Sequence, residues 1–309
     1  MLSKLHTILP KKAVSKYYLY TATTAVGFYS PIIFLFFRDT GLSYTEIALL
    51  ETAFMVTTFV GEIPTGYVGD RIGWRNSLLV GSALTSLTLF GIGFATSFLG
   101  LLALHIIWSL SFNFRSGSES AWLYKSLEQT IGSDAYSRVQ GRGRAVNLSV
   151  GAITAVIGGY LGSIELAVPF FAAGVLTAFG VPVLLTFPVT STTDRDEFSI
   201  RDATDSILND LLRSRIRGFI LYYIAFVYLM GVLRIFVQPI AVGAGLTIGT
   251  LGWIYGVTNA VSAGANYHTQ TIRDKIGIVR WMTITPLFVG VSFLLVYRFP
   301  VSVDHIGLE

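Results

Sequence analysis

The sequence has no cysteine. This absence excludes disulfide bonds, thiol catalysis and metal sites with cysteine ligands. Charged residues are also scarce, since they make up 13% of the 309 residues, whereas soluble domains contain about 25%. Hydrophobic residues make up 52% of the chain. So few charged side chains cannot cover a water-facing surface for a chain of this length, and the composition therefore predicts a protein that lies in a lipid bilayer.

Catalytic and cofactor motifs are absent as well. The sequence contains no phosphate-binding loop, no nucleophile elbow and no pair of histidines at metal-ligand spacing. We therefore expect no enzymatic activity, no cofactor and no metal site. The net charge of +4 lies mainly in short connectors between apolar runs, which is typical of membrane topology signals and argues against a nucleic-acid partner.

Long apolar runs are what the sequence does contain. The hydrocarbon core of a bilayer is about 30 Å thick, and a helix crosses it with around 20 apolar residues. The basic N-terminal segment has no cleavage site before the first apolar run, so this run is predicted to be retained as a span. We expect nine membrane spans, at residues 17–37, 44–68, 77–96, 98–123, 145–161, 169–187, 218–239, 251–267 and 281–297.

Lysine and arginine residues indicate the orientation of these spans. With the N-terminus in the cytoplasm, 18 of the 22 basic residues fall in cytoplasmic segments, as the positive-inside rule requires. This predicts a multi-pass protein of the cell membrane with a cytoplasmic N-terminus and, because the number of spans is odd, an external C-terminus. Apolar residues recur at helical spacing over residues 200–212, which fits an amphipathic helix on the membrane surface or an ordinary linker helix.

Two short segments recur 204 residues apart. Residues 41–43 read Gly-Leu-Ser and residues 245–247 read Gly-Leu-Thr, while residues 70–73 read Asp-Arg-Ile-Gly and residues 274–277 read Asp-Lys-Ile-Gly. This offset equals six spans, so both copies have the same orientation in the membrane. Such a parallel repeat is typical of transporters whose halves are related by an axis along the membrane normal.

The repeat predicts the domain organisation of an all-α membrane protein. We expect an N-terminal six-helix bundle over residues 1–187, a cytoplasmic linker over 188–217 and a partial C-terminal bundle of three helices over 218–309. A complete second copy would need three more helices. The sequence is therefore expected to be truncated after its ninth helix.

Residues 66–75, Gly-Tyr-Val-Gly-Asp-Arg-Ile-Gly-Trp-Arg, resemble the signature between the second and third helices of the major facilitator superfamily. That signature has Gly, three residues, Asp-Arg, one residue, Gly, one residue and a basic residue. Residues 61–66 and 116–124 are similar to segments of the drug-exporter-like branch. The resemblance implies a secondary active transporter that moves a small organic solute by alternating access, with proton-coupled efflux as the expected activity. Its partners would be the solute, protons and the lipid bilayer.

The sequence also departs from the patterns of proton-driven members. Asn113 occupies the position of the arginine in the fourth-span motif, and Arg115 is displaced from it. The fifth span has glycines but lacks the Gly-Pro pair of the antiporter motif, and Gln270 replaces a signature glycine in the second copy. These departures weaken the inference of proton antiport. Two alternatives stay open: a solute:proton uptake symporter, and a truncated chain that does not transport and acts as a remnant or an interaction protein.

The signature suggests a gate at the cytoplasmic end of the spans. Its glycines permit a close approach of two helices, its aspartate can accept hydrogen bonds from a helix N-terminus, and its arginines can pair with carboxylates or lipid phosphates. The alternative is a turn with a positive-inside anchor. The gate residues expected from both copies are Gly66, Asp70, Arg71, Gly73, Arg75, Asp274, Lys275 and Gly277.

Several ionisable residues fall within the predicted spans. At bilayer depth each costs roughly 2.5–3.5 kcal/mol, so by default it faces a cavity or a partner. On the second span, Glu51 and Glu62 share one helical stripe with two threonines, and we expect these carboxylates to line a central cavity. Glu46 can form a capping box with Ser43, which gives it a structural role.

The fourth and seventh spans carry the remaining candidates. Arg115 can pair with Glu119 four residues further on, either as a coupling site or as a neutralised structural pair. His105 is either a proton carrier or a hydrogen-bonded packing residue. Tyrosines of the first and seventh spans either stack a solute or have a role in the interface belt or in packing. The substrate or coupling candidates are Glu51, Glu62, His105, Arg115, Glu119, Arg234 and Gln238.

Overall fold

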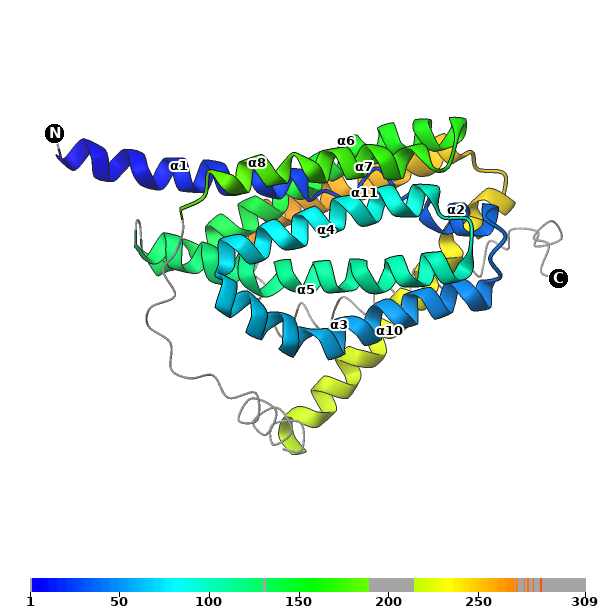
Figure 1. Cartoon of the computed structure of the whole chain (residues 1–309), viewed down its shortest axis with the longest axis horizontal. Helices are drawn as coiled ribbons and strands as arrows, with labels where there is room; N and C mark the ends of the chain where they lie inside the picture. Colours follow the sequence, from blue (N-terminus) through cyan, green and yellow to red (C-terminus); the bar gives the residue numbers. More distant parts are fainter. Residues whose placement is uncertain are drawn as a thin grey trace.

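The computed structural model describes residues 2–129, 132–188 and 214–269, with isolated positions beyond them. Within these ranges the chain forms helices and turns and no strand (Figure 1). The helices are α1 (Leu2–Thr23), α2 (Ile33–Asp39), α3 (Tyr44–Ile72), α4 (Trp74–Phe94), α5 (Phe98–Glu128), α6 (Tyr136–Ile164), α7 (Val168–Ala178), α8 (Gly180–Leu185), α10 (Ser214–Gly243) and α11 (Ile248–Tyr267). The prediction of an all-α fold is confirmed.

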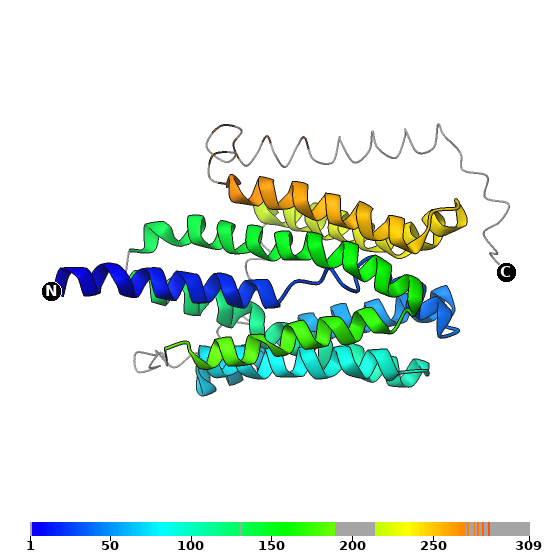
Figure 2. The ribbon, with the colours of Figure 1, turned by 90° about the horizontal axis from the view of Figure 1, so that it is seen from above.

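Most of the long helices lie roughly parallel, whereas α10 crosses them obliquely (Figure 1). α1 and α6 form a central layer, with α10 and α11 on one side and α3, α4, α5, α7 and α8 on the other (Figure 2). α11 packs along α6, and α4 packs between α5 and α7. We call the end of the molecule that holds residues 39–44 the α2 end, and the opposite end, with residues 66–75, the signature end.

Five helical segments are long and apolar enough to cross a membrane. They are Tyr44–Ile72, Trp74–Phe94, Phe98–Glu128, Tyr136–Ile164 and Val168–Leu185. These segments match the second to sixth predicted spans, although the fifth begins nine residues earlier than the predicted residue 145. The predicted amphipathic linker helix and the ninth span, residues 281–297, lie outside the described residues apart from one isolated position.

The first span was predicted as one continuous helix over residues 17–37, and this prediction is wrong. α1 ends at Thr23 and α2 begins at Ile33. The side chain of Thr23 donates to the carbonyl of Tyr20 at 2.7 Å, and that of Thr24 to the carbonyl of Thr21 at 2.9 Å. Such local bonds compete with the helix, and Pro31 further along lacks the N–H that a helix needs. Residues 24–32 are therefore irregular backbone between two helices.

The backbone reproduces the repeat found in the sequence. Gly41 and Gly245, which are equivalent, have φ angles of 86° and 88°. Gly73 and Gly277, the second equivalent pair, have φ angles of 88° and 79°. Only glycine adopts these left-handed conformations readily, so the same backbone requirement recurs at these positions of both copies.

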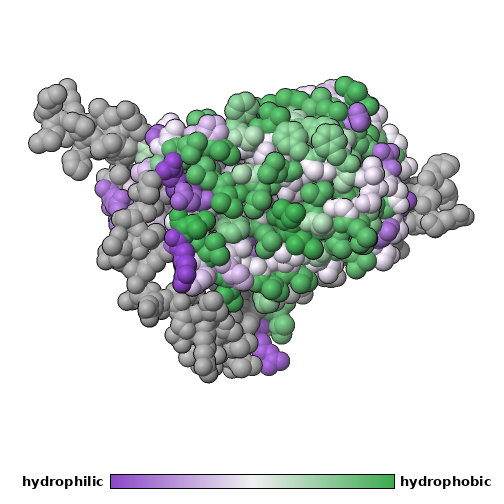
Figure 3. Space-filling view, in the orientation of Figure 1, coloured by the Kyte–Doolittle hydropathy of each residue, from purple (hydrophilic) through white to green (hydrophobic). Residues whose placement is uncertain are grey.

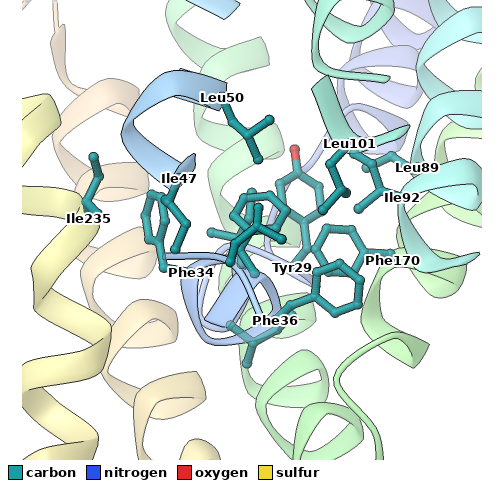
Figure 4. Close-up of a cluster of buried hydrophobic side chains, with 14 of the residues drawn as sticks. Tyr29, Phe34, Phe36, Ile47, Leu50, Leu89, Ile92, Leu101, Phe170 and Ile235 are labelled. Carbon is teal, nitrogen blue, oxygen red and sulfur yellow. The ribbon is translucent and has the colours of Figure 1, made fainter. Parts of the chain in front are cut away.

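The described surface has an apolar belt between two polar ends (Figure 3). Large apolar side chains that are exposed in the described residues include Phe59, Leu87, Phe94, Leu99, Ile153, Ile164 and Val261. A contiguous apolar surface of this size would be unfavourable in water, whereas it suits contact with lipid. Inside, aromatic and aliphatic side chains form a core cluster at the α2 end, which includes Tyr29, Phe36 and Phe170 (Figure 4).

Candidate functional site

The α1–α5 interface holds two oppositely charged side chains, each bonded to a tyrosine. Tyr17 Oη donates to Glu119 Oε1 at 3.1 Å. Arg115 Nε donates to Tyr20 Oη at 3.3 Å. The tyrosines are 2% and 0% exposed, whereas the two charged residues are partly exposed. We call Tyr17, Tyr20, Arg115 and Glu119 the charged cluster.

Helical spacing brings the members of the charged cluster together. Tyr17 and Tyr20 are three residues apart on α1, and Arg115 and Glu119 are four apart on α5, so each pair lies on one face of its helix. The ring of Tyr17 lies against Gly143 of α6, where an added Cβ would come within 2.5 Å of Tyr17 Cε1. A glycine at this point of α6 thus makes room for the tyrosine that binds Glu119.

The two charges do not pair with each other. Among the described residues, one ion pair has its nitrogen and oxygen within 4.0 Å. It joins Lys125 and Glu128 at 2.8 Å. The predicted pairing of Arg115 with Glu119 along α5 is therefore not formed, because tyrosines of α1 take up the two side chains instead. The cluster thus brings a carboxyl group, a guanidinium and two phenol hydroxyls into one small region.

His105 lies apart from the charged cluster. It is 1% exposed, its Nδ1 lies 2.8 Å from the carbonyl of Leu101, and its ring lies 5.3 Å from that of Phe37 and 5.7 Å from that of Trp108. Its Nε2 has no hydrogen-bond partner among the described residues. Ten residues of helix separate it from Arg115, which corresponds to about 15 Å along the axis. The structure therefore does not bring these two candidates together.

The predicted polar stripe of α3 divides between two environments. Thr58 faces α5, where its Oγ1 lies 2.8 Å from Ser109 Oγ, and Asn113 Nδ2 donates to the Thr58 carbonyl at 2.9 Å. Glu62 is exposed, and its carboxylate forms no hydrogen bond or ion pair with the residues that the structure describes. Glu51 is partly exposed and has an interaction partner. The two carboxylates therefore do not join the charged cluster.

The seventh-span candidates have different outcomes. Gln238 is fully buried and bonds to the first span, with its Oε1 3.0 Å from the Phe34 nitrogen and its Nε2 2.7 Å from the Ser30 oxygen. The side chain of Arg234 lies outside the described part of the structure. Gln238 thus contacts the other half of the molecule, at the α2 end.

At the signature end, two of the predicted gate residues have contacts in the structure. Arg75 donates to the carbonyls of Leu184 and Leu185 at 3.2 and 2.8 Å, so it binds the C-terminal end of α8. Arg71 lies over the ring of Tyr67 with its Cζ 4.6 Å from the centroid.

The other gate positions are described in part. A Cβ on Gly69 would lie 2.9 Å from Ser77 Oγ, which shows how closely α3 and α4 approach, whereas Gly66 has open space around it. Asp70 has an interaction partner. In the second copy, Lys275 is exposed and Gly277 keeps the φ of its equivalent, while Asp274 lies outside the described residues.

Sequence reasoning missed the role of the two tyrosine hydroxyls. The alternatives for Tyr17 and Tyr20 are solute stacking, the membrane interface and packing; both are buried in the structure, and their hydroxyls also bind the charged side chains of α5. The sequence contains a signal for these contacts. Tyr17 and Tyr20 are three residues apart in the first span, and Arg115 and Glu119 are four apart in the fourth span, so each pair lies on one helix face. Among the described residues, no group of three His, Asp or Glu side chains could hold a metal ion.

These features define a multi-pass helical membrane protein with a charged cluster between α1 and α5. The chain belongs to the Major Facilitator Superfamily, whose family model matches residues 19–306. An uncharacterized MFS-type transporter, YxaM of Bacillus subtilis strain 168, is 24% identical over 190 residues. That match covers 60% of this chain and 47% of YxaM, so the chain aligns with about half the length of this relative.

The fold is also similar to a solved structure. The crystal structure of the nucleoside transporter NupG matches with a TM-score of 0.65 at 11% sequence identity. The match covers 88% of this chain and 69% of NupG. At this identity, the likeness supports the arrangement of helices and not a shared substrate.

Proposed function

We propose that this chain works as a secondary active transporter of a small organic solute, by alternating access, and that the charged cluster binds the solute or the coupling proton. The observation that carries the proposal is the pair of opposite charges on α5 held apart by two tyrosines of α1. Charged groups in a membrane interior are costly and are usually kept for transport. Membership of the superfamily supports the same class of function.

Proton-coupled efflux is the form of transport that we propose. Glu119 is the carboxylate of the cluster, and a carboxyl group can lose or gain a proton while Tyr17 stays in place, since a phenol hydroxyl both donates and accepts. Arg115 keeps its charge and cannot take this part. The alternative proposal is uptake by solute:proton symport. The same residues would take part, and the solute would move into the cell.

The membrane placement belongs to the same proposal. The distribution of basic residues supports a cytoplasmic N-terminus in the cell membrane, which would make the signature end cytoplasmic and the α2 end external. We also propose the domain division into residues 1–187, 188–217 and 218–309. The carboxylates Glu51 and Glu62 are proposed to face a cavity between the halves.

Flux in proteoliposomes tests the proposal. The protein is reconstituted, and a set of amphipathic organic cations and nucleosides is assayed for movement after a pH jump. We expect Glu119→Gln to abolish proton-driven net flux and to leave solute exchange at equal pH intact, because exchange needs no proton step. Glu165→Gln, at an exposed carboxylate after α6, is the matched control and should behave as the wild type. No movement of any solute, or full pH-driven flux in Glu119→Gln, would contradict the proposal.

A further inference from the structure

Gln238 of α10 is inserted into the break of the first span. Its Oε1 accepts a hydrogen bond from the Phe34 N–H at 3.0 Å, and its Nε2 donates to the Ser30 carbonyl at 2.7 Å. In an uninterrupted helix, the N–H of residue 34 would donate to the carbonyl of residue 30. The carboxamide therefore replaces one helical hydrogen bond, with each of its ends in the place of a missing partner.

The backbone fixes the direction of this amide. The N–H of Phe34 can only donate and the carbonyl of Ser30 can only accept, so oxygen and nitrogen of Gln238 cannot be exchanged. The nitrogen also donates to Tyr255 Oη of α11 at 3.1 Å. The side chain is 0% exposed. One buried amide thus ties α10 and α11 to the first span.

The contact joins equivalent positions of the two copies. Phe34 and Gln238 are 204 residues apart, which is the offset of the repeat. An axis that relates two halves brings equivalent positions together only close to the axis itself. Because the first copy has phenylalanine here, only the side chain of the second copy can form this bond. The contact therefore lies at the centre of the interface and depends on one residue.

The neighbours of Gln238 dock α10 at the α2 end. Ile235 lies in the same core cluster as Phe34 and Ile47 (Figure 4). The ring of Phe236 lies 5.5 Å from that of Tyr44, the first residue of α3. The N-terminal end of α10, in contrast, projects away from the other described helices (Figure 1). The two halves thus meet at the α2 end through α10.

We propose that Gln238 pins the two halves together at the α2 end, and that this end opens when the amide withdraws from the first span. The inference rests on the alternating-access function proposed above. After withdrawal, the Phe34 N–H and the Ser30 carbonyl can bond to each other, so the first span keeps its backbone partners in both states. Gln238 is therefore a positioning residue that acts on the helix break and touches no solute.

Cross-linking between the halves tests whether Gln238 holds them together at the α2 end, a role that we call the pin. Because the chain has no cysteine, the double variant Tyr44→Cys/Phe236→Cys carries a unique thiol pair, which a short bifunctional thiol reagent can join. Adding Gln238→Leu removes two hydrogen bonds to the first span, and we expect the initial cross-linking rate to fall about tenfold or more. Gln140→Leu, at an exposed glutamine of α6, is the matched control and should leave the rate unchanged.

The outcomes separate the pin from a general role in folding and from the proposed transport. A rate unchanged by Gln238→Leu in folded protein would overturn the pin. If that variant does not fold, Gln238→Met replaces it, because methionine has a similar length and lacks both the amide donor and the carbonyl acceptor; an unchanged rate there would likewise overturn the proposal. The assay needs no solute. A lowered rate without any solute flux supports the pin and counts against the transport proposal, whereas flux with an unchanged rate counts against the pin alone.

Discussion

The first span and α10 occupy equivalent places in the repeat, but the first span is broken where α10 is continuous. Residues 24–32 correspond to residues 228–236, which lie inside the single helix Ser214–Gly243. In this stretch the first copy has Thr24 and Pro31 where the second copy has Tyr228 and Ile235, whereas Gly27 has a glycine, Gly231, as its equivalent. The repeat thus determines where each span lies, whereas the local sequence determines whether the span is one continuous helix.

A second pair of equivalent helices shows the same independence. Gly252 and Gly256 of α11 are buried, and Gly252 lies against Ala155 and Gly159 of α6. Their equivalents on α3, Ala48 and Thr52, are exposed within the described part of the chain. The same helix face is therefore an interface in one copy and an open surface in the other.

Substituting equivalent positions of α11 and α3 should give the largest contrast. A Cβ on Gly252 would lie 2.7 Å from the carbonyl oxygen of Ala155, which belongs to the backbone and cannot rotate away. We expect Gly252→Leu to lower the free energy of unfolding by about 3 kcal/mol or more. Ala48→Leu should change it by less than about 0.5 kcal/mol. Thermal unfolding in detergent measures both, and equal effects would contradict the difference between the two faces.

Removing the hydroxyl of Tyr20 should have a smaller effect, confined to the first copy. Its equivalent in α10 is Ile224, so the second copy has no such hydroxyl. Tyr20→Phe leaves the Arg115 guanidinium without its phenol acceptor, and we expect a loss of about 1–3 kcal/mol in the free energy of unfolding. Tyr124→Phe, at an exposed tyrosine of α5, is the control. Equal stability of the two variants would show that Tyr20 does not hold Arg115.

The smallest effect is expected at Tyr255. Tyr255→Phe removes one of the three hydrogen bonds of Gln238, while both bonds to the first span remain. We expect a loss of about 0.5–1.5 kcal/mol in unfolding free energy. In the Gln238→Leu background the same substitution should cost almost nothing, because the two residues then no longer interact. A double-mutant cycle measures this coupling, and full additivity would contradict it.

Hydropathy and motif spacing predicted much of the fold. The runs at residues 44–68 and 98–123 became α3 and α5, and the capping box at Ser43 is formed, with Glu46 N donating to Ser43 Oγ at 3.2 Å. The offset of 204 residues recurs in the φ angles of paired glycines. These features depend on the chain itself, through local composition and residue spacing.

The break and the site partners could not be predicted in this way. An apolar run is equally consistent with one helix or with two short ones. In the broken span, the Phe34 N–H and the Ser30 carbonyl find their partner in Gln238, which is distant in sequence. Likewise, spacing along α5 indicated that Arg115 can reach Glu119, but tyrosines of another helix compete for both side chains. Which partner a polar group finds depends on packing between helices that are distant in sequence.

Thiol reactivity at Ile235 tests the central claim, that Gln238 holds α10 against the first span. Ile235 is 7% exposed in the core cluster, whereas its neighbour Val237 is 49% exposed. With a water-soluble maleimide, Ile235→Cys should react slowly, and adding Gln238→Leu should raise its rate about tenfold or more. Val237→Cys should react at the same rate with and without Gln238→Leu. An Ile235→Cys rate that does not change when Gln238 is replaced would contradict the account.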